Sequence, residues 1–265
     1  MVVVLPTKNR EELRNRILSA VQDLYADVAS NPDKGFHFPT GRPACEYVGY
    51  PKVELDAIPA TALESFAGVG YPFAAGIIRE GMTVLDIGSG SGTDLINAAR
   101  KVGPRGSVIG IDLTDEMIRK GTANLEAAGI TNGSVQKSNA EALPIGDAAV
   151  DVVTSNGVIN LVPDKKKSFT EIFRVLKPGG RIQISDIVLA KEISEKSKAN
   201  PALWAECIVG AIPEQAYVDL VLDTGFADVE IVGRIDYFDR SPSDSTRNAA
   251  NQFGATSITI RGRKP

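Results

Sequence analysis

The segment that decides the fold of this chain is Thr83-Val84-Leu85-Asp86-Ile87-Gly88-Ser89-Gly90-Ser91-Gly92-Thr93-Asp94. It opens with a short apolar run, which is typical of a strand buried on both faces of a parallel sheet. Alternating glycines and serines then end the strand, and a helical pattern follows from Asp94 to Lys101. A strand, a tight glycine turn and a helix in this order predict the place where an open α/β sheet binds a nucleotide-like ligand.

The spacing of the glycines and an acidic residue beside them indicate which ligand. In the dinucleotide fingerprint G-x-G-x-x-G, Gly88 and Gly90 fit, but Thr93 occupies the third position and a glycine falls one residue early, at Gly92. Asp86, two residues before the first glycine, would repel a pyrophosphate at short range. The same carboxylate suits a ligand that carries an ammonium and a sulfonium. S-adenosylmethionine carries both, and we therefore expect it as the cofactor.

A second acidic residue supports this interpretation. Asp112 ends the apolar run that begins at Val108, about one β-α-β step after Asp86. A carboxylate at the end of that strand is placed to accept hydrogen bonds from ribose hydroxyls. The plainer alternative is a generic glycine turn with a solvated aspartate. Two acidic residues that end consecutive buried strands around GSGSG favour the cofactor site.

Composition excludes several classes of protein. The chain has 265 residues, of which 43% are hydrophobic and 23% charged, as in ordinary globular domains. Its net charge of −4 argues against sequence-independent binding to nucleic acid. The apolar N-terminal run is too short for a signal peptide, and no run is long enough to span a bilayer. Two cysteines do not make a disulfide framework, so we expect a cytoplasmic protein with free thiols. A single histidine leaves little scope for a metal site, and we predict none.

The chain divides into two parts. Residues 1–72 are predicted to form an N-terminal helix, from Glu11 to Ala29, and a lid segment that is rich in glycine and proline, with a loop over residues 35–43. This segment would cover a ligand or simply pack against the core. Residues 73–265 are predicted to form one α/β domain, with an insertion at about 190–212.

In that domain strands and helices alternate, as in a Rossmann-like, mostly parallel sheet. We predict five strands before the insertion, at Thr83–Ile87, Ser107–Leu113, Ser134–Lys137, Val150–Ser155 and Arg181–Val188. The helices between them are predicted at Asp94–Lys101, Asp115–Ala128 and Asp164–Leu176. After the insertion, Val229–Phe238 and Ala255–Arg263 flank a polar loop, Asp239–Gly254, and should pair as an antiparallel hairpin at one end of the sheet.

Several motifs together resemble a known family. They are VLDIGSGSGTD, VIGIDLTDEMI, SNAEALP, SNGVINLVPDK, VLKPGGR, SDIV and PALWAECIVGA, in that order. This set is similar to the class I S-adenosylmethionine-dependent methyltransferases, and most similar to the arsenite methyltransferases. The resemblance implies a seven-stranded sheet whose last strand is antiparallel, with residues 73–265 as the methyltransferase domain. It also implies a small-molecule substrate. The oligomeric state stays open.

The resemblance also implies roles for individual residues. The methionine part of the cofactor would be held by Asp86, Gly88, Ser89 and Gly90, and the ribose by Asp112 with Leu113 and Met117 beside it. The adenine would be bordered by Asn139, Ala140 and Glu141, and the transferring methyl group by Ser155 and Asn156.

The departures from the family concern its thiols, which hold trivalent arsenic because a soft centre prefers soft ligands. Cys207 in WAECIVGA matches the family, and Cys45 is a looser candidate for a second thiol. Two other family cysteines are replaced, one by Gly157 and one, at or near the matching position, by Val69.

Four functions therefore stay open. One is methylation of arsenic held by Cys207, by Cys45 and by an external thiol. Another is methylation of an organic small molecule in an apolar pocket, for which a hydroxyl or amine acceptor would need a general base such as His37 or Asp186. The third is a non-catalytic module that only binds S-adenosylmethionine, and the fourth, against which the glycine spacing argues, is a nicotinamide-dependent oxidoreductase.

Overall fold

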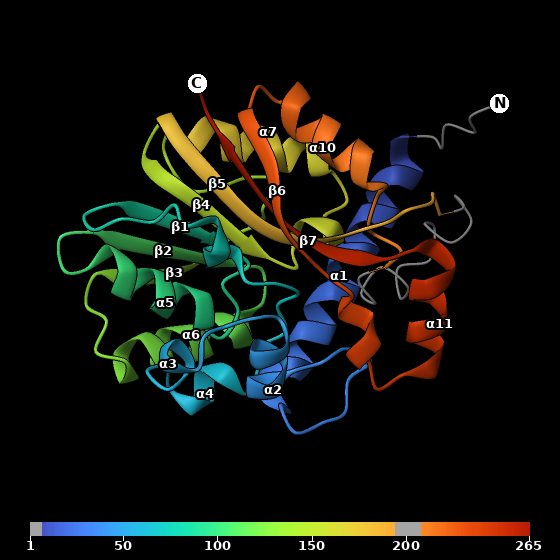
Figure 1. Ribbon diagram of the computed structural model, residues 1–265, viewed down its shortest axis with the longest axis horizontal. Coiled ribbons are helices and arrows are strands. Elements are labelled where there is room, and N and C mark those ends of the chain that lie inside the picture. Colours follow the sequence, from blue (N-terminus) through green and yellow to red (C-terminus); the bar gives the residue numbers. More distant parts are fainter. Residues whose placement is uncertain (1–6, 194–207) are drawn as a thin grey trace.

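The protein is built on one seven-stranded sheet with strand order β3-β2-β1-β4-β5-β7-β6 (Figure 1). The computed structural model describes residues 7–193 and 208–265. The strands are β1 (Thr83–Ile87), β2 (Ser107–Asp112), β3 (Gly133–Lys137), β4 (Val150–Asn156), β5 (Leu176–Val188), β6 (Ala227–Ile235) and β7 (Thr256–Arg263). The first five run parallel, and β7 pairs antiparallel with both β5 and β6. The predicted α/β class, with a seven-stranded sheet and an antiparallel last strand, is confirmed.

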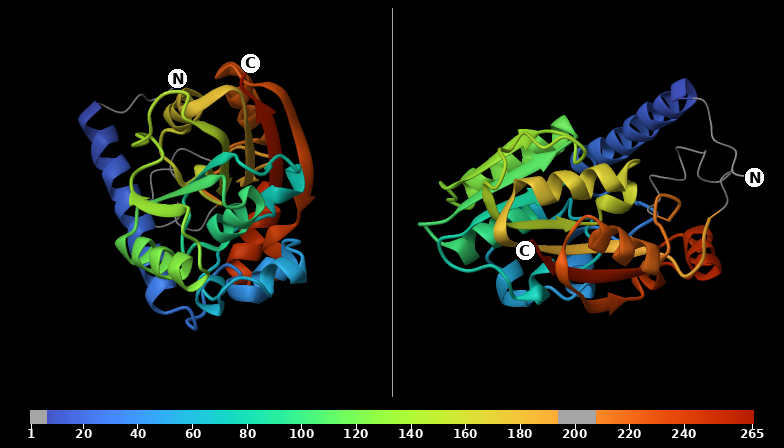
Figure 2. Two further views of the ribbon diagram at one scale, coloured as in Figure 1. Left: turned by 90° about the vertical axis from the view of Figure 1, so that its left-hand side faces the viewer. Right: turned by 90° about the horizontal axis from the view of Figure 1, so that it is seen from above.

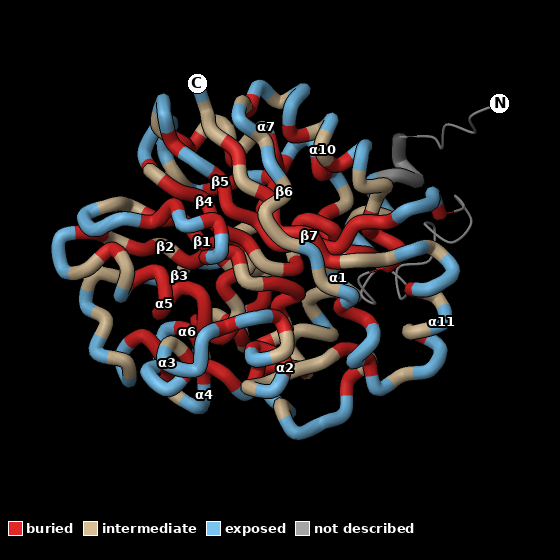
Figure 3. The backbone as a smooth tube through the Cα atoms, in the orientation of Figure 1, coloured by how far each residue is buried: buried red, intermediate tan, exposed pale blue. Residues whose placement is uncertain are grey.

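The strand order reverses beside β1: the chain first adds strands on one side of β1 and then on the other. Strand β1 pairs with β2 on one side and with β4 on the other, so the connections leave it in opposite directions. Its residues Val84 to Ile87 are fully buried, as the uniformly red strands at the centre of Figure 3 show. In open α/β sheets a ligand binds outside the carboxyl end of the strands at such a reversal. The segment around Asp86 therefore ends at the binding edge of the sheet.

Helices cover both faces of the sheet (Figure 2). One face packs against α5 (Thr93–Val102) and α6 (Asp115–Ala127), and the other against α7 (Lys165–Val175) and α10 (Glu214–Asp223). Side chains of β1 alternate between the two cores: Val84 belongs to the first, and Leu85 and Ile87 to the second. This alternation follows from the two-residue period of a strand.

The N-terminal segment adds four helices and one 3-10 turn to the α5 and α6 face. They are α1 (Thr7–Ser30), α2 (Gly41–Tyr47), α3 (Lys52–Leu55), α4 (Ala60–Leu63) and η1 (Pro72–Ala75). Arg14 ties α1 to the sheet domain, because its guanidinium donates to the buried carboxylate of Glu141 at 2.6 and 3.0 Å. The prediction of a loop over residues 35–43 is wrong from Gly41 onward, because α2 begins at that residue. Pro43 is compatible with this because a proline is tolerated in the first turn of a helix.

The C-terminal part corrects two further predictions. The segment Asp239–Gly254 is not a polar loop, because it contains α11 (Asp244–Phe253) after the short turn η3 (Tyr237–Arg240). Strand β5 begins at Leu176, where a predicted helix was expected to end. The short turn η2 (Ile159–Leu161) follows β4. Of the predicted insertion at 190–212, residues 194–207 lie outside the described part of the chain.

The N-terminus of α7 offers a test of local stability. The side chain of Asp164 accepts a hydrogen bond from the Lys167 backbone N–H at 2.9 Å and so caps the helix. We expect Asp164→Ala to lower the free energy of unfolding by about 1 kcal/mol in urea denaturation. Asp164→Asn keeps an oxygen acceptor and should lose much less. Equal losses in the two variants would mean that the cap contributes nothing.

Candidate functional site

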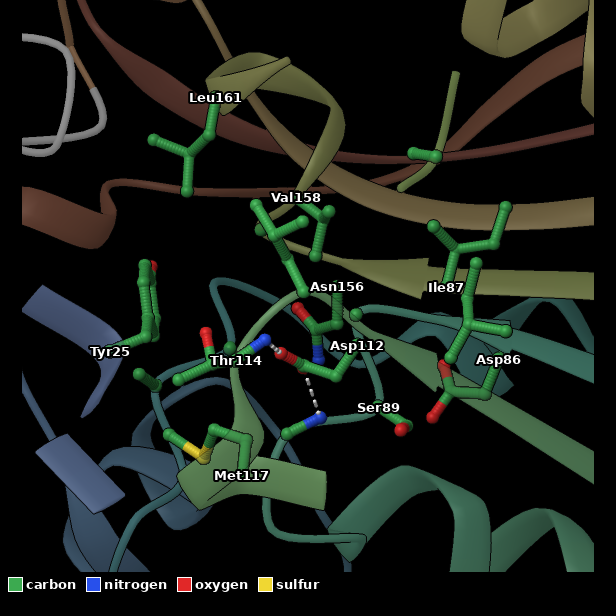
Figure 4. Close-up of a pocket in the computed structure, with 18 of the residues that line it drawn as sticks. Tyr25, Asp86, Ile87, Ser89, Asp112, Thr114, Met117, Asn156, Val158 and Leu161 are labelled. Carbon is green, nitrogen blue, oxygen red and sulfur yellow. Dashed lines mark hydrogen bonds between the residues drawn. The ribbon is translucent and has the colours of Figure 1, made fainter. Parts of the chain in front are cut away.

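A cavity opens at the carboxyl ends of β1, β2 and β4 (Figure 4). It holds about 990 Å³ of empty space when its open mouth is included. The sheet side contributes the loop after β1 and the ends of β2 and β4. The opposite wall comes from Leu18, Val21 and Tyr25 of α1 and from residues 65–68. The N-terminal segment therefore forms part of the site, as expected for a segment that covers a ligand.

The glycine loop brings main-chain atoms to the floor of the cavity. Gly88 and Gly90 have φ angles of +70° and +52°, a region that side chains disfavour. The N–H groups of Gly88 and Ser89 donate to the Ile111 carbonyl at 2.8 and 2.9 Å, which fixes the loop to the end of β2. Helix α6 approaches the loop so closely that a Cβ on Gly121 would lie 2.9 Å from the Gly90 oxygen. The loop is therefore rigid and presents backbone to a ligand.

Asp112 is held in a fixed orientation beside this loop. Its two carboxylate oxygens accept hydrogen bonds from the N–H groups of Gly90 and Thr114, each at 2.9 Å (Figure 4). Burial raises the pKa of this carboxyl above its usual value, and the backbone hydrogen bonds oppose that rise. Each oxygen keeps a lone pair for a further donor, such as a hydroxyl. The residue therefore has the geometry expected for a contact with ribose.

Asp86 is the most poorly satisfied carboxylate of the cavity. Its side chain is 2% exposed, and its Oδ2 has no hydrogen-bond partner within the described residues. Burial raises its pKa well above the ordinary value, and the nearby charges of Asp94 and Asp112 raise it further. A buried charge without a partner is costly. A cationic group bound in the cavity would relieve that cost, so this residue fits the positively charged methionine end of S-adenosylmethionine.

The charge of the whole lining has the same sign. Three carboxylates, Asp86, Asp94 and Asp112, line the cavity, and none of the described lining residues is a lysine, arginine or histidine. A pyrophosphate would meet no positively charged side chain among these residues. The lining therefore favours a cationic ligand over a dinucleotide.

Most of the other predicted cofactor residues also line the cavity. They are Gly88, Ser89, Gly90, Leu113, Met117, Asn139, Ala140 and Asn156. Glu141 and Ser155 do not. The carboxylate of Glu141 pairs with Arg14 and accepts the Asp164 N–H at 3.1 Å. The hydroxyl of Ser155 donates to the Ile87 carbonyl at 3.0 Å, so both side chains serve the framework around the site.

Three of the predicted acceptor-side residues, Cys45, His37 and Asp186, do not line the cavity. Cys45 is fully buried in α2, outside the lining, and burial raises the pKa of its thiol. His37 packs edge-on against Phe38, and its carbonyl accepts the Ser241 hydroxyl at 2.5 Å. Asp186 is buried beside Tyr217, whose hydroxyl donates to it at 3.0 Å, and burial raises its pKa to about 7. Cys207 lies outside the described residues.

Two positions where the family carries cysteine lie side by side. A Cβ on Gly157 would be 3.1 Å from Cγ1 of Val69, although the two residues are far apart in the sequence. Gly157 lines the cavity and has a φ angle of +75°. The two positions at which the resemblance implies replaced thiols are therefore neighbours in the fold.

Sequence reasoning assigned no role to Asp94. The residue appeared only as the start of a helix, although its carboxylate lines the cavity. Its hydrogen-bond donors are Tyr50 and Asn156. No local motif connects positions 50, 94 and 156, so only the fold could bring them together.

Comparison with known proteins agrees with the site. A family model described as a methyltransferase domain matches residues 78–239, more than half of the chain. The chain belongs to this methyltransferase family. It is 34% identical to an arsenite methyltransferase from Halobacterium salinarum, over 98% of this chain and 68% of that protein. A rat arsenite methyltransferase is 29% identical over 85% of this chain, which spans 60% of the rat protein.

Solved structures give the same result. An arsenic(III) S-adenosylmethionine methyltransferase from Chlamydomonas reinhardtii superposes with a TM-score of 0.64 at 30% identity, over 80% of this chain and 72% of that one. A geranyl diphosphate C-methyltransferase from Streptomyces coelicolor shares the fold, with a TM-score of 0.63 at 18% identity, over 94% of this chain and 98% of that one. The chain is thus an S-adenosylmethionine-dependent methyltransferase that is similar to arsenite methyltransferases. None of its described helices is both long and apolar enough to cross a membrane.

The ribose contact can be tested by removing one charge. We expect Asp112→Asn to weaken binding of S-adenosylmethionine by about 10-fold to 100-fold, the range for a lost hydrogen bond to a charged group. Isothermal titration calorimetry measures this directly. Asp115→Asn is the matched control, because Asp115 lies three residues on but pairs with Lys137 at the surface. Unchanged affinity in Asp112→Asn would show that this carboxylate does not touch the cofactor.

Proposed function

We propose that this methyltransferase acts on a small acceptor that already offers a lone pair, with trivalent arsenic as the first candidate. The observation that carries the proposal concerns the two predicted bases: in the described part of the chain, neither His37 nor Asp186 lines the cavity. A hydroxyl or an amine must lose a proton during methyl transfer and needs a base within hydrogen-bond reach. Arsenic(III) needs none.

At the donor end, this chain's residues would bind and orient the cofactor, which supplies a methyl group on a cationic sulfur. Asp86 would face the cationic methionine part and Asp112 the ribose. The backbone of the loop from Gly88 to Gly90 would approach the ligand closely. Asn139 and Ala140 line the part of the cavity that is proposed for the adenine. Transfer neutralises the positive charge, so orientation and exclusion of water are the main contributions of the protein.

At the acceptor end, arsenic would be held by fewer protein thiols than in the family. Cys45 is buried away from the cavity with its thiol pKa raised, so it would not serve as a thiolate ligand. We propose that Cys207 and a small external thiol hold arsenic(III). Relatives named arsenite methyltransferases support this choice of acceptor. A reducing compartment such as the cytoplasm would suit an enzyme that depends on a free thiol.

A second acceptor is favoured by one feature of the site. Gly157, Val158 and Leu161 give the cavity an apolar wall, and Val69 lies beside Gly157. An organic molecule with an apolar body would pack there without any thiol. This candidate predicts turnover that is independent of Cys207.

Turnover with arsenite distinguishes the two acceptors. The reduced protein is incubated with labelled S-adenosylmethionine, arsenite and glutathione, and S-adenosylhomocysteine is quantified. We expect arsenite-dependent product, with a loss of at least tenfold in Cys207→Ser. Cys45→Ser is the matched control and should retain the activity of the unmodified chain. No product above background, or full activity in Cys207→Ser, would contradict arsenic as the acceptor of this thiol.

A further inference from the structure

Asp94 lies in the first turn of α5, and its carboxylate lines the cavity while being only 7% exposed. Both of its oxygens accept hydrogen bonds from neighbouring side chains. The Tyr50 hydroxyl donates to Oδ1, and the Asn156 side-chain amide donates to Oδ2 at 3.0 Å. Such hydrogen bonds to a charged group are short and directional. The carboxylate is therefore held in one orientation in the lining of the cavity.

The two donors are themselves held by the fold. Tyr50 is buried in an aromatic cluster, edge-on to the rings of Phe66 and Tyr71 at centroid distances of 5.3 and 4.7 Å. The Asn156 amide also donates to the Tyr50 oxygen at 3.1 Å, so the three side chains close a ring of hydrogen bonds. A group that is preorganised to bind a ligand needs neighbours that hold it in place in this way.

Asn156 also connects this network to the opposite wall. Its Oδ1 accepts the N–H groups of Val69 and Gly70 at 2.8 and 3.1 Å, and its amide donates to the Gly70 carbonyl at 2.9 Å. The loop before η1 is thus fixed by the same side chain that holds Asp94. One amide side chain therefore connects Asp94 to the loop that carries Val69 and Gly70.

Asp94 and Asp86 act on each other electrostatically inside the cavity. The charge of Asp94 raises the pKa of Asp86, and burial raises the pKa of Asp94 itself to about 6. The hydrogen bonds from Tyr50 and Asn156 favour the charged form of Asp94 and so limit that rise. A cationic group bound beside these two carboxylates would offset the cost of burying their charges, because the described lining holds no basic side chain.

We propose that Asp94 is a second carboxylate contact for the ammonium group of the cofactor, and that Tyr50 and Asn156 are positioning residues for it. The inference rests on the proposed binding of the methionine part beside Asp86. It adds a residue that contacts the amino-acid end of the ligand and two that act through that residue.

Ligands with and without the amino-acid end test the proposal. The probes are S-adenosylhomocysteine, which carries the ammonium, and 5′-methylthioadenosine, which has the same nucleoside but no amino acid. In Asp94→Asn, we expect the Kd for S-adenosylhomocysteine to rise about tenfold or more. The Kd for methylthioadenosine should change less than about twofold, because that ligand has no group for Asp94. Tyr50→Phe should give the same pattern with a smaller rise.

Tyr71→Phe is the matched control. It removes a hydroxyl from the same aromatic cluster, but one that bonds to Glu54 at 2.9 and 3.0 Å and not to Asp94. Both affinities should stay unchanged, and thermal unfolding of every variant reports whether the fold is kept.

Two results for the variants would overturn the proposal. Equal weakening of both ligands in Asp94→Asn would mean that Asp94 only supports the fold, and unchanged affinity for both would mean that it is no contact. If the unmodified chain bound neither ligand, the proposed function itself would fail, which separates the two claims.

Discussion

Three carboxylates are buried around one cavity, and the free-energy cost of keeping their charges there is the constraint on which the site depends. Asp86 and Asp112 end neighbouring parallel strands, and Asp94 begins the helix that follows the first of them. Burial raises the pKa of all three. Backbone N–H groups satisfy Asp112 and side chains satisfy Asp94, but one oxygen of Asp86 has no partner among the described residues. A cation that binds in the cavity would offset the remaining cost.

The fold places this charge where a nucleoside also fits. Reversal of the strand order beside β1 opens a crevice, and the glycine loop allows close approach of a ligand to the backbone. The N-terminal helix α1 then supplies an apolar wall and is anchored through Arg14 and Glu141. Negative charge, a nucleoside-sized crevice and an apolar cover together describe a site for a methyl donor with a cationic centre.

Much of this could be predicted from the sequence, because local signals determined it. The apolar run with Asp86, the glycine spacing and the acidic end of the next strand predicted the central fold and the donor site. The helices α2 and α11 were missed because glycine, proline and polar residues dominate their segments, whereas tertiary contacts and capping decide their structure. The hydrogen bonds of Asp94 with Tyr50 and Asn156 join three distant parts of the chain and could not be predicted from spacing.

Prediction from the sequence has the same limit for the residues on the methyl-acceptor side of the site. Motif matching identified Gly157 and Val69 as replaced thiol positions, but only the fold shows that they touch. Cys45 looked like a possible thiol ligand in the sequence, yet α2 places it in the core outside the cavity. Side-chain chemistry can be read from a sequence, whereas access to a cavity depends on packing.

The central claim is that the buried carboxylates select a cationic methyl donor over a phosphate-bearing dinucleotide. Calorimetric titration of the unmodified chain with S-adenosylmethionine and, separately, with NAD tests it most directly. The account predicts saturable binding of S-adenosylmethionine and no measurable heat of binding for NAD. Binding of NAD without binding of S-adenosylmethionine would contradict it.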